Sequence, residues 1–157
     1  MSDEQTYEQQ ITRDRPTLAI ADDDAFMCSM LATQLGFAFE CVGTAADTDA
    51  AIELASVQQP DAMILDVIMP GGGALKATRA IRASSPNTAI VILSSDELHS
   101  DVIDLLNAGA SAYLRKGIDA QDLAQGLTAS IAAHGHARER VSAVADTESH
   151  ASGGARS

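Results

Sequence analysis

Acidic, hydroxyl and ammonium side chains follow short apolar runs at four separate places in the chain. Asp22 and Asp23 come directly after the mainly apolar residues 17–21, and Asp66 ends the apolar run that begins at residue 62. Ser94 follows a third run and Lys116 a fourth. Short apolar runs of this kind are typical of strands buried on both faces of a parallel sheet. Because such strands deliver their carboxyl ends to one edge, we expect these side chains to meet there.

These residue types indicate chemistry on a phosphoryl group. Three carboxylates at adjacent strand ends would repel one another unless a cation lay between them, and hard oxygen ligands suit Mg²⁺. A divalent ion, the Lys116 ammonium and the Ser94 hydroxyl would neutralise and orient a phosphoryl group, whose charge is spread over its oxygens. A carboxylate can accept phosphate as a covalent acyl phosphate. Asp66, central among these groups, is therefore the predicted nucleophile.

Five strands alternate with five helices along the sequence. The predicted strands are residues 17–21, 37–42, 62–66, 89–93 and 111–115. Asp24 is placed to cap the first helix, and in the fourth helix Val102, Leu105 and Leu106 are predicted to face inward. Strict alternation predicts an α/β fold, with a doubly wound parallel sheet of order 2-1-3-4-5 and right-handed crossovers. The expected ligand crevice lies between the first and third strands, where the carboxylates converge.

Length and composition predict one domain with polar ends. The chain has 157 residues, and the 46% that are apolar suffice for one sizeable core. Residues 17–134 form the expected domain. Residues 1–16 are polar and lack periodicity, which predicts a disordered arm. The composition of residues 135–157 predicts a polar tail. Val141 and Val144 support a short helix in it, followed by a disordered end.

Charge and cysteine usage narrow the class of partner. The formal net charge of −12 repels a phosphate backbone, so direct nucleic-acid binding is not expected. No apolar run approaches the length of a membrane span, and the polar, acidic start is unlike a signal peptide. Cys28 and Cys41 lack metal-ligand spacing and are expected to be reduced thiols. These observations predict a cytoplasmic protein whose partners are proteins or small ions.

Four motifs in this order resemble the receiver domains of two-component response regulators. They are residues 18–24 (LAIADDD), 64–71 (ILDVIMPG), 91–95 (VILSS) and 108–116 (AGASAYLRK). The resemblance covers roughly residues 17–134 and implies a flavodoxin-like, CheY-like fold. It also implies a phosphoprotein that is no enzyme beyond its own phosphorylation and autodephosphorylation. The implied partners are a sensor histidine kinase or histidine phosphotransfer protein and a downstream protein target.

The resemblance also assigns roles to single residues. It implies that Asp66 is phosphorylated, and that Asp23, Asp66 and the backbone carbonyl of Ile68 bind Mg²⁺ directly while Asp22 acts mainly through water. Ser94 and Lys116 take the places of the switch hydroxyl and of the lysine that contacts a phosphoryl oxygen. Tyr113 takes the place of the switch aromatic. Phosphate on Asp66 would then draw Ser94 toward it, let Tyr113 turn inward and change the surface of the fourth helix, fifth strand and fifth helix.

Three departures from the family pattern carry expectations of their own. Gly117 replaces the proline that usually follows the lysine through a cis bond, so we expect a trans peptide and a loosened loop. Ala74 stands where the family has a glycine. Ile68 and Asp96 match positions that tune autodephosphorylation, and an apolar Ile68 cannot orient an attacking water. We therefore expect a longer-lived phosphorylated state than in relatives with an amide there.

Alternative interpretations remain beside this one. A Mg²⁺-dependent phosphohydrolase of the haloacid dehalogenase type would use Asp22 as its nucleophile, with Asp24 completing an Asp-X-Asp pattern. A degenerate receiver would act as an interaction module without phosphorylation. His134 and His136 could suggest a metal site, but histidines at this spacing in a polar tail are more often solvated.

The output of the predicted switch is also open. No helix-turn-helix or catalytic output domain fits after residue 134, which favours a stand-alone receiver that signals by protein contact or relays phosphate. The alternative is the receiver part of a longer protein. A homodimer through the fourth and fifth helices is a further alternative.

Overall fold

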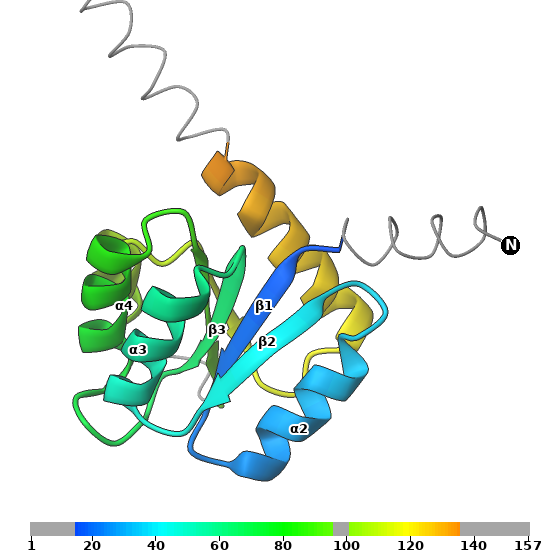
Figure 1. Cartoon of the computed structure of the whole chain (residues 1–157), viewed down its shortest axis with the longest axis horizontal. Coiled ribbons are helices and arrows are strands. Elements are labelled where there is room, and N and C mark those ends of the chain that lie inside the picture. Colours follow the sequence, from blue (N-terminus) through cyan, green and yellow to red (C-terminus); the bar gives the residue numbers. More distant parts are fainter. Residues whose placement is uncertain (1–14, 96–100, 136–157) are drawn as a thin grey trace, which may run out of the picture.

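The computed structural model describes residues 15–95 and 101–135 (Figure 1). Its strands are β1 (Thr17–Ala21), β2 (Glu40–Ala45), β3 (Ala62–Asp66), β4 (Ala89–Ser94) and β5 (Ala112–Arg115). Its helices are α2 (Ala25–Gln34), α3 (Thr48–Gln58), α4 (Gly73–Ser84), α5 (Val102–Ala108) and a last helix over residues 120–135. None of the helices in the described ranges is both long and apolar enough to cross a membrane.

The five strands form one parallel sheet of order β2-β1-β3-β4-β5. This order confirms the predicted doubly wound, flavodoxin-like α/β fold. The chain moves outward from β1 in one direction to β2 and in the other through β3, β4 and β5. The crevice of such a sheet lies where the winding reverses, at the carboxyl ends of β1 and β3.

Alternate residues of the strands build two separate cores. Met63, Leu65 and Ile92 point to the face covered by α3, α4 and α5. Ile20 and Ile64 point to the opposite face, where they pack against α2 and the 120–135 helix. Figure 1 shows α3 and α4 on one side of the sheet and α2 with the orange C-terminal helix on the other. Burial on both faces explains why the central strands are almost entirely apolar.

The structure corrects two details of the predicted elements. The second strand begins at Glu40 and not at residue 37, because residues 35–38 form a turn, after which the Phe39 N–H donates to the Leu35 carbonyl. In α5, Leu105 is buried but Leu106 is 45% exposed, so the predicted inward stripe is wrong at Leu106. This helix has only seven residues and one buried position.

Two hydrogen bonds attach the residues before β1 to the rest of the domain. The Arg15 guanidinium donates to the Gly36 carbonyl at 2.6 Å, and the Pro16 carbonyl accepts from the Glu40 N–H at 2.9 Å. Arg15 and Pro16 therefore belong to the packed domain, although they fall within the predicted arm. Of the predicted tail, the structure describes residue 135 alone.

Candidate functional site

The carboxyl edge of the sheet gathers the polar residues that the sequence singled out. Asp22 follows β1, Asp66 ends β3, Ser94 ends β4 and Lys116 follows β5. These positions are far apart in the sequence, and they meet because every strand of the sheet runs in the same direction. The cluster lies at the switch point of the sheet.

The three consecutive aspartates after β1 have three different environments. Asp24 caps α2, as predicted, because its carboxylate accepts from the Phe26 and Met27 N–H groups at 3.0 and 3.3 Å. Asp22 is only 3% exposed and accepts from the Asp24 N–H at 2.9 Å. Asp23 is exposed to solvent. The loop that leads into the capped helix thus places the buried carboxylate of Asp22 and the accessible carboxylate of Asp23 beside β3.

A glycine loop holds the segment that follows Asp66. Gly71, Gly72 and Gly73 have φ angles of 96°, 123° and 80°, a region that favours glycine. Thr48, at the start of α3, ties this loop down: its hydroxyl accepts from the Gly73 N–H at 2.9 Å, and its own N–H donates to the Pro70 carbonyl at 2.9 Å. The loop therefore has a fixed path, although no side chain among the described residues caps α4 at Gly72.

Thr48 is a supporting residue that the sequence analysis missed. It is fully buried, and its partner glycine is 25 residues away. A threonine that precedes a helical stripe looks like an ordinary helix start, so its sequence position carries no signal of this contact.

Lys116 connects two of the carboxylates. Its ammonium lies 2.9 Å from a carboxylate oxygen of Asp22 and 3.2 Å from one of Asp66. The Lys116 N–H also donates to the Ser94 carbonyl at 2.8 Å, which anchors the backbone next to β4. The Lys116–Gly117 peptide is trans, as predicted, and Gly117 has a φ angle of 91°. The expected looseness of this loop stays a prediction.

Burial and charge shift the ionisation of the two central groups. Burial, followed by the charge of Asp22, raises the pKa of Asp66, while Lys116 and a backbone hydrogen bond from Ile68 oppose the shift. Burial disfavours the charged form of Lys116, but its hydrogen bonds to Asp22 and Asp66 and the negative charges of these two carboxylates together outweigh that effect and raise its pKa. The site therefore carries more negative charge than Lys116 alone can balance.

The acidic cluster fits a divalent cation. Carboxylate oxygens of Asp22, Asp23 and Asp66 all lie within 4.8 Å of one another. Ligands of octahedral Mg²⁺, at about 2.1 Å from the ion, are about 3.0 to 4.2 Å apart. Small side-chain rotations would therefore bring these oxygens into a coordination shell. One ammonium faces three carboxylates, so a divalent ion would also relieve their mutual repulsion.

Ile68 lies next to this cluster on the loop that follows β3. Its side chain is 68% exposed, and its N–H donates to the Asp66 carboxylate. The role of the Ile68 carbonyl as a metal ligand stays a prediction.

Ser94 and Tyr113 lie on neighbouring strands behind the cluster. Ser94 is 3% exposed. Tyr113 pairs with Ile92, two residues before Ser94, so both side chains belong to the same face of the sheet. The Tyr113 ring packs partly buried against the core, and its buried hydroxyl has no hydrogen-bond partner among residues 15–95 and 101–135. An orphaned buried hydroxyl is unfavourable by about 1–3 kcal/mol.

The remaining predicted positions are placed as follows. Asp96 and His136 lie outside the described residues. His134 is partly buried, and its Nε2 lies 2.7 Å from the Pro86 carbonyl and 3.3 Å from the Arg82 guanidinium. With its proton on Nε2, His134 donates to Pro86, which is a structural contact between the last helix and the turn before β4. Ala74 is buried near the start of α4.

Comparisons with known proteins agree with this geometry. Residues 18–128 match the family model described as the response regulator receiver domain. The chain is 31% identical over 106 residues to the response regulator MprA of Mycolicibacterium vanbaalenii, covering 68% of this chain and 46% of MprA. It is 36% identical over 86 residues to the nitrate/nitrite response regulator protein NarL of Escherichia coli K12, covering 55% of this chain and 40% of NarL. The chain thus spans less than half the length of these relatives.

Solved structures lead to the same family. The two-component response regulator of the LuxR family from Aurantimonas sp. SI85-9A1 superposes with a TM-score of 0.71 at 26% identity, covering 76% of this chain and 87% of that one. The response regulator domain of Thermotoga maritima CheB gives a TM-score of 0.65 at 25% identity, covering 76% and 96%. With the family match over most of the chain and the acidic cluster at the switch point, we conclude that this chain belongs to the response regulator receiver domains, the phospho-accepting signalling domains of two-component systems.

Proposed function

We propose that Asp66 accepts a phosphoryl group from a sensor histidine kinase or a histidine phosphotransfer protein. The observation that carries this proposal is the position of Lys116, whose ammonium contacts both Asp22 and Asp66 at the carboxyl edge of the sheet. In the transfer, a carboxylate oxygen of Asp66 forms a bond to phosphorus as the bond between phosphorus and the donor imidazole breaks. The imidazole nitrogen keeps the electron pair of that bond and takes up a proton.

Each neighbouring residue has a proposed part in this transfer. Asp22, Asp23, Asp66 and the Ile68 carbonyl are the proposed ligands of Mg²⁺, with Asp22 acting mainly through water. When bound, Mg²⁺ supplies positive charge for the phosphoryl oxygens and for the crowded carboxylates. Lys116 exchanges part of its contact with Asp66 for a phosphoryl oxygen.

The output of the switch is proposed to be a change in the surface of α5, β5 and the 120–135 helix. Phosphate on Asp66 attracts the Ser94 hydroxyl, and Tyr113 changes its packing behind it. The orphaned Tyr113 hydroxyl supports this step, because its present position is poorly satisfied. Ile103 and Leu106 on α5 are 70% and 45% exposed, which supports contact with a downstream protein. A homodimer through the same helices is the alternative, and measuring molar mass with and without phosphorylation distinguishes the two.

A haloacid dehalogenase type phosphohydrolase, with Asp22 as its nucleophile, is disfavoured by the contacts of Asp24, the second acid of its Asp-X-Asp pattern. The Asp24 carboxylate caps α2 by accepting from the Phe26 and Met27 N–H groups, so it serves the helix and not the site. A degenerate receiver is disfavoured because the three acids lie within 4.8 Å of one another and Lys116 contacts Asp22 and Asp66.

The deciding experiment uses Mg²⁺ and a small-molecule phosphodonor. Intact mass should increase by one phosphoryl group, and hydroxylamine should remove it, because an acyl phosphate is cleaved by this nucleophile. Asp66→Asn should abolish the adduct. Asp24→Asn, which keeps a capping side chain on the same loop, should retain it. An adduct mapped to Asp22, or one that persists in Asp66→Asn, would contradict the proposal.

A further inference from the structure

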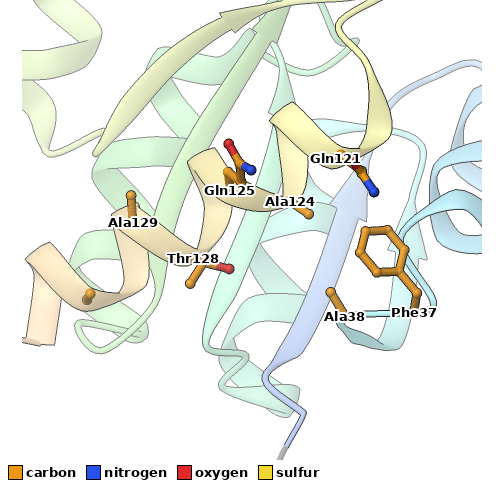
Figure 2. A pocket seen from close by; sticks show the side chains of 8 residues that line it. Phe37, Ala38, Gln121, Ala124, Gln125, Thr128 and Ala129 are labelled. Carbon is orange, nitrogen blue, oxygen red and sulfur yellow. The ribbon is translucent and has the colours of Figure 1, made fainter.

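A groove runs along the 120–135 helix on the face of the domain away from α3 and α4. It has a volume of about 560 Å³, and Phe37 and Ala38 form one wall while Gln125, Ala129 and Ala132 contribute to the other. Figure 2 shows Phe37 and Ala38 facing the helix across this space. None of the residues that line it is charged, and the Phe37 side chain is 62% exposed. The groove therefore offers an uncovered apolar surface.

The N-terminal segment enters the domain beside this groove. Arg15 bonds to the Gly36 carbonyl, and Pro16 accepts a hydrogen bond from Glu40. These two contacts bracket the turn that carries Phe37 and Ala38. Arg15, the first described residue, is therefore anchored beside the turn that forms one wall of the groove.

The composition and reach of residues 1–14 match the groove. Apart from Met1, the large apolar residues of this segment are Tyr7 and Ile11, four positions apart among polar residues. Ile11 lies four residues before Arg15 and Tyr7 eight, so an extended chain spans up to about 13 Å and 26 Å to them. The groove follows the helix from Gln121 to Ala132, a rise of about 16 Å. Both side chains can reach it from Arg15.

We propose that the chain's own N-terminal segment binds in this groove, with Tyr7 and Ile11 contacting Phe37 and the small residues of the 120–135 helix. The tether favours this occupant, because a short linker gives an effective concentration in the millimolar range. The glutamines of the segment and the groove residues Gln121 and Gln125 provide amide partners around the apolar contact. The segment thereby covers the surface shared by the turn after α2 and the last helix. This inference does not depend on phosphorylation.

Site-specific photocrosslinking in the full chain tests the proposal. A benzophenone amino acid replaces Tyr7 or, in a second protein, Ile11, and crosslinked peptides are identified by mass spectrometry of the monomer. We expect crosslinks to residues 37–38 or 121–132, with a yield that does not change on dilution. Crosslinks confined to covalent dimers would assign the groove to a second copy and overturn the proposal. Crosslinks elsewhere in the chain, or none from both positions, would overturn it as well.

A charge in the groove provides the matched comparison. Ala129→Glu places a carboxylate in the groove at an exposed helical position, whereas Ala133→Glu makes the same change at an exposed position that does not line it. We expect the crosslink yield to fall several-fold in Ala129→Glu and to be unchanged in Ala133→Glu. Thr128→Glu, also exposed in the groove, replaces Ala129→Glu if circular dichroism shows that variant to be misfolded. An unchanged yield in the folded groove variant contradicts the proposal.

Discussion

The ammonium nitrogen of Lys116 lies 3.2 Å from a carboxylate oxygen of Asp66, although their strands β5 and β3 are separated by β4. The contact crosses the end of β4 and passes the backbone of Ser94, to which Lys116 is also bonded. A phosphoryl group on Asp66 would therefore change the partner of the Lys116 ammonium, and the backbone of Lys116 is hydrogen-bonded to the end of β4. This link connects the chemistry at β3 to the packing of β4 and β5.

The raised pKa of Asp66 predicts that removing its charge stabilises the metal-free protein. Burial and the charge of Asp22 make the folded state hold the Asp66 proton more tightly than the unfolded state does. Stability then decreases as pH rises from the ordinary value of 3.8 through the raised folded pKa. We expect Asp66→Asn, measured in a chelating buffer at pH 7, to unfold a few degrees higher than the native chain.

The pH dependence of this difference is the critical measurement. At low pH Asp66 is protonated in both states, so the advantage of Asp66→Asn should shrink as pH falls toward 4. Thermal unfolding followed by circular dichroism at several pH values measures it. A variant that is less stable at pH 7, or an advantage that increases on acidification, contradicts the assigned cause of the shift.

Mg²⁺ should stabilise the native chain through the acidic cluster. Binding to the folded state alone contributes about 1.4 kcal/mol at ten times the dissociation constant. Asp23→Asn should lose most of this gain, because it removes an accessible member of the cluster. Asp24→Asn changes the charge by the same amount one residue away while keeping the helix cap, so it should retain the gain. Thermal shifts in a Mg²⁺ titration measure both, and equal losses in the two variants would indicate a diffuse ionic effect.

The sequence predicted the parts of the fold that burial on both faces makes conspicuous. β1, β3 and β4 are almost fully buried and appear as continuous apolar runs, so their ends were located closely. The edge strand β2 is mostly half-buried, and the buried Phe39 lies directly before it, after the turn of residues 35–38. The mixed polar and apolar pattern of β2 gave no clear first residue, and the strand was predicted to begin three residues too early. Leu106 was misplaced because a helix of seven residues shows too little periodicity to define its buried face.

The candidate site was predictable in its members but not in its contacts. Strand ends and residue types brought the acids, Ser94 and Lys116 to one edge. Which aspartate is buried and which is exposed depends on the path of the loop after β1, and the sequence DDD does not specify that path. The bond from Thr48 to the glycine loop is equally invisible, because it depends on how α3 packs beside the loop.

The orphaned hydroxyl of Tyr113 predicts that Tyr113→Phe does not destabilise the unphosphorylated protein. The substitution keeps the ring and removes a buried oxygen without a partner, so the free energy of unfolding should be unchanged or higher by about 1 kcal/mol. Thr78→Val is the matched control, because the buried Thr78 hydroxyl on α4 also has no hydrogen-bond partner in the part of the chain that the structure describes. Urea unfolding measures both effects.

If the hydroxyl belongs to the proposed switch, Tyr113→Phe alone should weaken binding of the phosphorylated form to a downstream partner. Equal binding by both variants would argue against that role.

Ile68 should lengthen the life of the phosphorylated state. Its side chain is 68% exposed beside Asp66 and carries no polar atom that could orient an attacking water. We expect Ile68→Asn to speed hydrolysis of the Asp66 phosphoryl group several-fold, because an amide can position the water. The side chain is mostly in solvent, so the substitution should change the free energy of unfolding by less than about 0.5 kcal/mol. Intact-mass measurements after removal of the phosphodonor give the decay rate, with Ile68→Leu as the apolar control. Decay that is equally fast in all three proteins would show that the Ile68 side chain does not control water access to the acyl phosphate.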